Sequence, residues 1–119
     1  MVEFCMAYRG ILANHDICAT NTTGRMVSEA TGLPIKLHLS CNQGGGDQIA
    51  SRIAYNELDL VLYFCDPLMI AEYQKSVMEI ARACDRQNVP FATNAATAEA
   101  LILGLERGDL DWRDIVNPK

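Results

Sequence analysis

Four short segments of this sequence combine hydroxyl groups, glycines and carboxylates in patterns that suit anion binding and proton transfer: 20–24, 39–48, 65–68 and 92–99. Threonine hydroxyls beside the open N–H groups at the start of a helix form a cradle for phosphate. Carboxylates close to a bound substrate act as general bases or acids. Because both kinds of group occur together, the sequence indicates a small phosphorylated ligand and proton transfer on it.

The first two segments each have a simpler structural interpretation, which the sequence leaves open. In Thr20-Asn21-Thr22-Thr23-Gly24, a threonine can serve only as the N-cap of the following helix. In the loop Ser40-Cys41-Asn42-Gln43-Gly44-Gly45-Gly46, three glycines allow the backbone to approach a ligand closely. Asp47 follows this loop and can be either an N-cap or a catalytic base.

The other two segments also carry two interpretations each. Asp66 follows an apolar run and precedes Pro67. It can therefore be either part of an ordinary Asp-Pro turn or a functional carboxylate. In the last segment, Asn94 or Thr97 can cap a helix, and Glu99 can merely favour its positive end. Only the combination of all four segments favours a functional site.

Short apolar runs alternate with segments of helical period, which is typical of β-α units. Strands are predicted at 16–20, 35–39, 58–64 and 89–93. Helices are predicted at 2–12, 47–56, 71–86 and 98–105. A further helix is predicted to follow a turn at 21–24 and to end at about residue 31. The tail 109–119 is expected to dock through Trp112 and Ile115. We therefore predict one α/β domain, 1–119: a three-layer α/β/α sandwich with a mostly parallel sheet. In such sheets, ligands bind beyond the carboxyl ends of the strands, where all four segments fall.

Composition excludes several classes of protein. The 119 residues are 50% hydrophobic and 21% charged, which is enough for one core, and the net charge of −5 argues against nucleic-acid binding. No apolar run approaches the roughly 20 residues of a membrane span, and Glu3 stands where a signal peptide carries positive charge. Five cysteines without a Cys-x-x-Cys pair, and only two histidines, predict reduced, mostly buried thiols and argue against a zinc site. We expect a cytoplasmic protein.

Taken together, these segments resemble methylglyoxal synthase. The resemblance rests on Ala19-Thr20-Asn21-Thr22-Thr23-Gly24, the Gly-Gly-Asp-Gln loop, Phe64-Cys65-Asp66-Pro67-Leu68 and Ala92-Thr93-Asn94-Ala95-Ala96-Thr97-Ala98-Glu99. The stretch 104–113 is similar to the tail of Firmicute-type members. The resemblance runs in order over essentially the whole chain.

The resemblance implies a cytoplasmic lyase without a metal or other cofactor, usually a homohexamer, that converts dihydroxyacetone phosphate to methylglyoxal and inorganic phosphate. An Asp of the family removes a proton to give an enediol phosphate, which then expels phosphate, and a His helps to move protons. Carried over by motif, the phosphate ligands are Thr20, Thr22, Thr23 and Ser40. The candidate catalytic acids and base are Asp47, Asp66 and Glu99.

Three departures from the family pattern support a second hypothesis. Asn21 replaces a glycine of the family's Thr-Gly-Thr-Thr-Gly turn, and Tyr73 stands at the position of the catalytic His. In an ungapped alignment the catalytic Asp position becomes Gly46, with Asp47 one residue late; a gap before Asp47 restores the match but requires a deletion after Gln48. The alternative is a non-catalytic phosphate- or effector-binding paralogue, a use that the same fold has in the regulatory domain of carbamoyl-phosphate synthetase.

The beginning of the chain differs as well. The family opens with an apolar strand that ends in His-Asp near a Lys, whereas Met1 aligns inside the first helix. We therefore expect the first strand of the sheet to be absent. We also expect the lyase activity to be impaired, because a base displaced by ~1 Å can lower the rate by ~10²-fold. A third hypothesis is a truncated chain that folds only in an oligomer, because the open sheet edge invites pairing.

Overall fold

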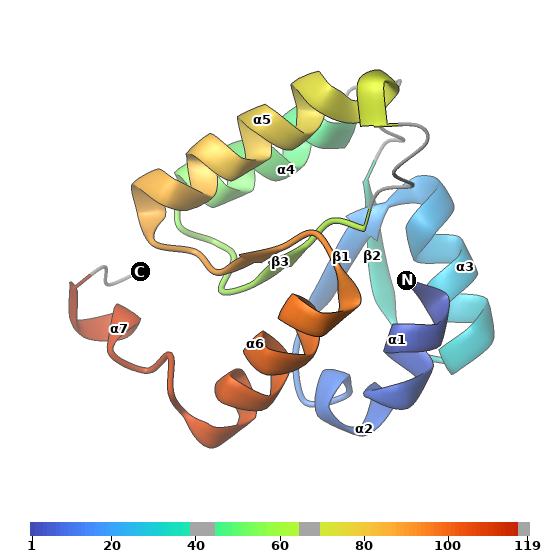
Figure 1. Ribbon diagram of the computed structural model, residues 1–119. Helices are drawn as coiled ribbons and strands as arrows, with labels where there is room; N and C mark the ends of the chain where they lie inside the picture. Colours follow the sequence, from blue (N-terminus) through green and yellow to red (C-terminus); the bar gives the residue numbers. More distant parts are fainter. Residues whose placement is uncertain (39–44, 65–69, 117–119) are drawn as a thin grey trace. The chain divides into compact units, whose positions relative to one another are not determined.

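The computed structural model describes residues 1–38, 45–64 and 70–116, apart from the side chains of residues 45–47 and 70–76. The chain divides into two compact units, Met1–Gln48 and Ile49–Lys119. Each unit holds one pair of parallel strands flanked by helices (Figure 1). The α/β fold class predicted from the sequence is therefore confirmed.

The first unit contains α1 (Val2–Ala7), α2 (Arg9–Leu12), β1 (Ile17–Thr20), α3 (Asn21–Thr31) and β2 (Ile35–His38). Strands β1 and β2 are parallel, and α3 packs against both strands and against α1 (Figure 1). Both strands lie within the ranges predicted for them, 16–20 and 35–39. The predicted helix 2–12 is instead divided into two short helices. The buried apolar side chains of this unit are Phe4, Cys5, Leu12, Val27 and Leu33.

The second unit receives the end of α4 (Gly45–Ala54) and contains β3 (Val61–Leu62), α5 (Ile70–Gln87), β4 (Phe91–Ala92), α6 (Ala95–Arg107) and α7 (Arg113–Val116). Strands β3 and β4 are parallel. The helical spacing predicted for α5 is confirmed, since it places Ile80 and Cys84 in the core, each 1% exposed. The core cluster consists of Ile53, Val61, Ile80, Ala83, Cys84 and Val89.

Strands β3 and β4 are shorter than predicted, and Pro90 supplies a local reason. Pro90 has no N–H group, so the ladder cannot continue through its nitrogen. The hydrogen bonds that remain include those from the N–H of Val61 to the Pro90 oxygen, at 3.0 Å, and from the N–H of Tyr63 to the Ala92 oxygen, at 2.8 Å.

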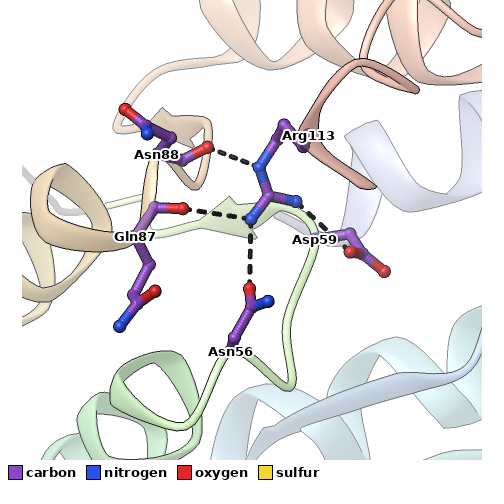
Figure 2. Close-up of polar contacts among 5 residues, drawn as sticks. All are labelled: Asn56, Asp59, Gln87, Asn88 and Arg113. Carbon is purple, nitrogen blue, oxygen red and sulfur yellow. Dashed lines mark hydrogen bonds and ion pairs between the residues drawn. The ribbon is translucent and has the colours of Figure 1, made fainter. Parts of the chain in front are cut away.

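The C-terminal segment is anchored by a residue other than the two predicted. Trp112 is 49% exposed and Ile115 is 83% exposed, so the prediction that they dock the tail is wrong. The buried residue is Arg113, at 4% exposure. Its guanidinium lies between the ends of α4 and α5 and donates to Asn56, Asp59, Gln87 and Asn88 (Figure 2). Because these acceptors already converge there, an arginine fills the position better than an apolar side chain.

None of the helices in the described parts of the chain is long and apolar enough to cross a membrane.

Candidate functional site

The Thr20–Gly24 segment lies where a parallel strand passes directly into a helix. β1 ends at Thr20 and α3 begins at Asn21, so the predicted turn 21–24 is instead the first turn of the helix. Asn21 is therefore helical, and the non-glycine residues with positive φ are elsewhere in the described chain. Because a helical φ suits any L residue, asparagine in place of the family glycine puts no strain on the backbone here.

The N-terminus of α3 has no side-chain cap. Thr20 occupies the N-cap position with an extended backbone (φ −64°, ψ 157°), and its side chain makes no capping hydrogen bond. The N–H groups of the first helical turn therefore point outward without a side-chain acceptor from Thr20. Together with the partial positive charge of the helix end, they form an arrangement suited to an anion.

The N-terminus of α6 follows the strand β4, as α3 follows β1, but it is capped by the side chain of Asn94. Asn94 Oδ1 accepts a hydrogen bond from the N–H of Thr97 at 2.9 Å. This confirms the capping interpretation of the segment 92–99 for Asn94. Glu99 lies exposed beyond the first turn of α6, where the effect of the helix dipole on a carboxylate has declined.

A close approach of helix to strands holds the start of α3 in place. Gly24 is buried, and a Cβ at this position would collide with the Leu37 side chain and lie 3.2 Å from Ala19 Cβ. The missing side chain therefore lets α3 lie directly on β1 and β2. This contact positions Thr20, Thr22 and Thr23 at the carboxyl end of β1.

The three threonines differ in their exposure. Thr22 is exposed, whereas Thr20 and Thr23 are half-buried. Thr23 also lines a shallow pocket of about 340 Å³ between α1 and α3. The other residues of this pocket are Met1, Val2, Glu3 and Met26. The hydroxyl groups thus offer a bound ligand contacts at the strand end and beside this pocket.

The remaining sequence-predicted site residues are only partly described. Asp47 is the third residue of α4, so it is not the N-cap, and it lies one residue after Gly46. Successive helical residues are about 100° apart around the axis, so the two positions face different directions. The side chains of Asp47 and Tyr73 lie outside the described residues, as do Ser40 and Asp66 altogether. Within one unit, the structure brings together Thr20, Thr22 and Thr23.

One residue that the sequence motifs do not mark lies beside these threonines. His38 is the last residue of β2 and the register partner of Thr20. Its ring atom Nε2 is buried. A histidine in an alternating strand has no motif of its own, and only the pairing of β1 with β2 places it at the site.

The described cysteines are structural in character. Cys5 and Cys84 are buried, Cys18 is half-buried, and all three are free thiols. The pKa of the Cys84 thiol is raised to about 11, mainly by burial and to a lesser extent by Asp85, while Arg113 acts in the opposite direction. Burial also raises the pKa of Cys5. Among the described residues, no three His, Cys, Asp or Glu side chains gather where they could hold a metal ion.

Comparison with known proteins assigns the family. The family model described as MGS-like domain matches residues 1–93. The chain is 51% identical over 119 residues to a methylglyoxal synthase of Caldicellulosiruptor saccharolyticus. This match covers 100% of this chain and 84% of that protein. It is 50% identical over 117 residues to a methylglyoxal synthase of Geobacillus thermodenitrificans, with 98% and 81% coverage.

A solved structure agrees with these relatives. The crystal structure of methylglyoxal synthase from Elizabethkingia anophelis superimposes with a TM-score of 0.75 at 30% sequence identity. The match covers 85% of this chain and 66% of that chain. Sequence and fold thus lead to the same conclusion: the chain belongs to the methylglyoxal synthase family.

Proposed function

We propose that this protein is a methylglyoxal synthase-type lyase, which converts dihydroxyacetone phosphate to methylglyoxal and inorganic phosphate. The observation that carries the proposal is the N-terminus of α3, which has no side-chain cap and three threonines around it. Kinship to proteins named methylglyoxal synthase over the full length of the chain supplies the reaction.

The N-terminus of α3 would act on the phosphate in two ways. First, its N–H groups and the hydroxyls of Thr20, Thr22 and Thr23 would bind the phosphate of the substrate, together with Ser40. Second, the same groups would stabilise the negative charge that grows on phosphate as the C–O bond breaks. Fixed donors aimed at developing charge contribute more to the rate than groups that must first reorient.

Asp47 is the proposed base. It would remove a proton from the carbon that bears the free hydroxyl, which gives an enediol phosphate. The enediol then expels phosphate, and the remaining three-carbon enol becomes methylglyoxal by proton transfer. Asp66 and Glu99 are proposed as supporting acids in these transfers. No metal or organic cofactor is needed for this sequence of steps.

A second function is favoured by the position of Asp47 in α4. If Gly46 occupies the place of the family base, Asp47 is turned by about 100° from it and the substrate carbon lies out of reach. The protein would then bind phosphate or a phosphorylated effector without turnover. Tyr73 at the place of the catalytic His favours the same alternative, because an unperturbed phenol with a pKa near 10 transfers protons poorly at neutral pH.

Two measurements on the full chain distinguish these functions. A coupled assay with dihydroxyacetone phosphate should detect methylglyoxal above the uncatalysed background, and calorimetry should detect binding of inorganic phosphate. Binding without turnover selects the second function, and absence of binding contradicts both. The double variant Gly46→Asp with Tyr73→His should then raise turnover if only these two departures limit it.

The biological setting is proposed on the same grounds. We expect a cytoplasmic homo-oligomer, a hexamer by resemblance, whose partners are its substrate, its phosphate product and other copies of itself. Size-exclusion chromatography with light scattering measures the oligomeric state.

A further inference from the structure

Helix α3 has a buried side and a solvent side, and Arg25 lies on the solvent side. The buried residues of the helix are Gly24, Val27 and Thr31, and a Cβ at Gly24 would meet side chains of both β1 and β2. Arg25 and Thr22 are both exposed. Since they are three residues apart in a helix, they are neighbours on one face, with Cβ atoms roughly 5–6 Å apart. Arg25 is thus adjacent to a threonine of the proposed phosphate cradle.

The geometry of a helix directs the side chain of Arg25 toward the same cradle. Cα–Cβ bonds in an α-helix tilt toward its N-terminus, and the favoured rotamers of long side chains continue in that direction. Within the described parts of the chain, the Arg25 guanidinium makes no ion pair or hydrogen bond. Glu29, four residues later and exposed, is not paired with it either. The guanidinium group is therefore available to a ligand at the helix N-terminus.

A phosphate ester bound at this cradle needs more positive charge than the helix end supplies. Its phosphate group carries about −1.5 to −2 charges at pH 7. The N-terminus of a helix contributes only about half a positive charge, and threonine hydroxyls are neutral. A cationic side chain close to the first turn of α3 would balance part of the remaining charge.

The other Lys and Arg residues of the unit Met1–Gln48 are Lys36 and Arg9, and neither is directed at the cradle. Leu37 of β2 faces α3, so its neighbour Lys36 projects from the opposite face of the strand. The start of α1 lies beside Thr23 at the shared pocket, whereas Arg9 follows the other end of that helix. Arg25 is the basic side chain that α3 itself carries.

We propose that Arg25 binds the phosphate group of a small phosphate ester, or inorganic phosphate, at the N-terminus of α3. This proposal rests on the phosphate cradle of the proposed function. The guanidinium fork donates two parallel hydrogen bonds to two phosphate oxygens, and such charge-assisted bonds are stronger than bonds between neutral groups. The arginine thus contacts the ligand from the solvent side, while the N–H groups of the first turn contact it along the helix axis.

The first test compares variants of the full chain by calorimetric titration with inorganic phosphate at low salt. Arg25→Gln removes the charge and the fork, and should weaken phosphate binding by about five- to tenfold. Arg25→Lys keeps the charge without the parallel donors, and should recover part of this loss. Arg9→Gln is the matched control, because it removes another exposed arginine of the same unit; it should bind within about twofold of the unaltered protein.

Two outcomes of this titration would overturn the proposal. One is equal phosphate affinity of Arg25→Gln and the unaltered protein, both folded by circular dichroism. The other is an equal loss in Arg25→Gln and Arg9→Gln, which would show an effect of net charge rather than a contact. Absence of phosphate binding by the unaltered protein would instead contradict the cradle itself.

The second test observes the contact directly. The Nε–H resonance of Arg25 is assigned in NMR spectra by its absence from the spectrum of Arg25→Lys. Titration with inorganic phosphate should shift this resonance with the same saturation curve that calorimetry gives, because the N–H group donates to the ligand. Phosphate binding that leaves the Arg25 Nε–H resonance unmoved would overturn the proposal.

Discussion

Arg113 donates a hydrogen bond from Nε to the main-chain oxygen of Asn88, the residue at which the chain leaves α5 with a positive φ of 54° (Figure 2). The same guanidinium reaches Asn56, which leaves α4 with a φ of 56°. Two left-handed helix ends and the C-terminal segment are thus joined by one buried side chain.

Arg113→Lys should lower the free energy of unfolding by about 3 kcal/mol, because acceptors left without a donor cost about 1–3 kcal/mol each. An ammonium group cannot replace the several donors of the guanidinium fork. Urea denaturation measures the change. The matched control is Arg107→Lys. Arg107 Nη2 lies 2.8 Å from Asp109 Oδ2, and both side chains of this ion pair are largely exposed. This control should cost less than about 1 kcal/mol, and equal losses in both variants would contradict the role given to Arg113.

Gly24→Ala should destabilise the first unit by about 1 kcal/mol, since the added methyl group displaces the end of the Leu37 side chain and lies only 3.2 Å from Ala19 Cβ, which cannot rotate away. Gly10→Ala is the matched control, because a Cβ at Gly10 meets nothing within 4 Å and the residue is helical. That change should stabilise the protein by about 0.5 kcal/mol. Thermal unfolding of both variants tests the pair, and a neutral Gly24→Ala would show that the close contact is not required.

Thr22→Ala should weaken phosphate binding by about tenfold, the effect of one hydrogen bond to a charged ligand. Its control is Thr97→Ala at the N-terminus of α6. There the N–H of Thr97 already donates a hydrogen bond to Asn94 Oδ1, so this helix end is capped. The control should leave phosphate affinity unchanged. Calorimetric titration of the two variants distinguishes them, and a similar loss at both positions would contradict the assignment of the cradle to α3.

The Cys84 thiol should make stability depend on alkaline pH. Its folded pKa of about 11 lies above the ordinary value of 9.0, because burial disfavours the thiolate. The unfolded state therefore releases its proton first as the pH rises, and the stabilising contribution is complete below pH 9.0 and lost toward pH 11. Over this range, the free energy of unfolding should fall by about 2–3 kcal/mol on this account.

Cys84→Ala should flatten this decline, whatever its effect on stability at neutral pH. Cys18→Ala keeps Cys84 and should therefore keep the slope. Urea unfolding at a series of pH values from 8 to 11 measures both variants. An unchanged slope in Cys84→Ala would show that another group causes the alkaline loss; Cys5, whose pKa burial also raises, is the next to test.

Local patterns determined much of the secondary structure. The alternation of Ile35 to His38 produced a strand, the period of α5 buried Ile80 and Cys84, and Gly32 ended α3 in the left-handed conformation. These outcomes depend on residues within a few positions of one another. For that reason, they can be derived from a single chain. The threonine segment at the start of α3 was predicted on the same basis.

Long-range contacts decided the rest. No local pattern reveals that Arg113, 54 residues after Asp59, is buried while Trp112 beside it is largely exposed. The place of a buried arginine depends on acceptors that only the folded chain brings together. The same holds at the candidate site, where the sequence predicted the threonines but not His38. The register of β1 with β2 makes it the neighbour of Thr20, and register is a property of the paired strands alone.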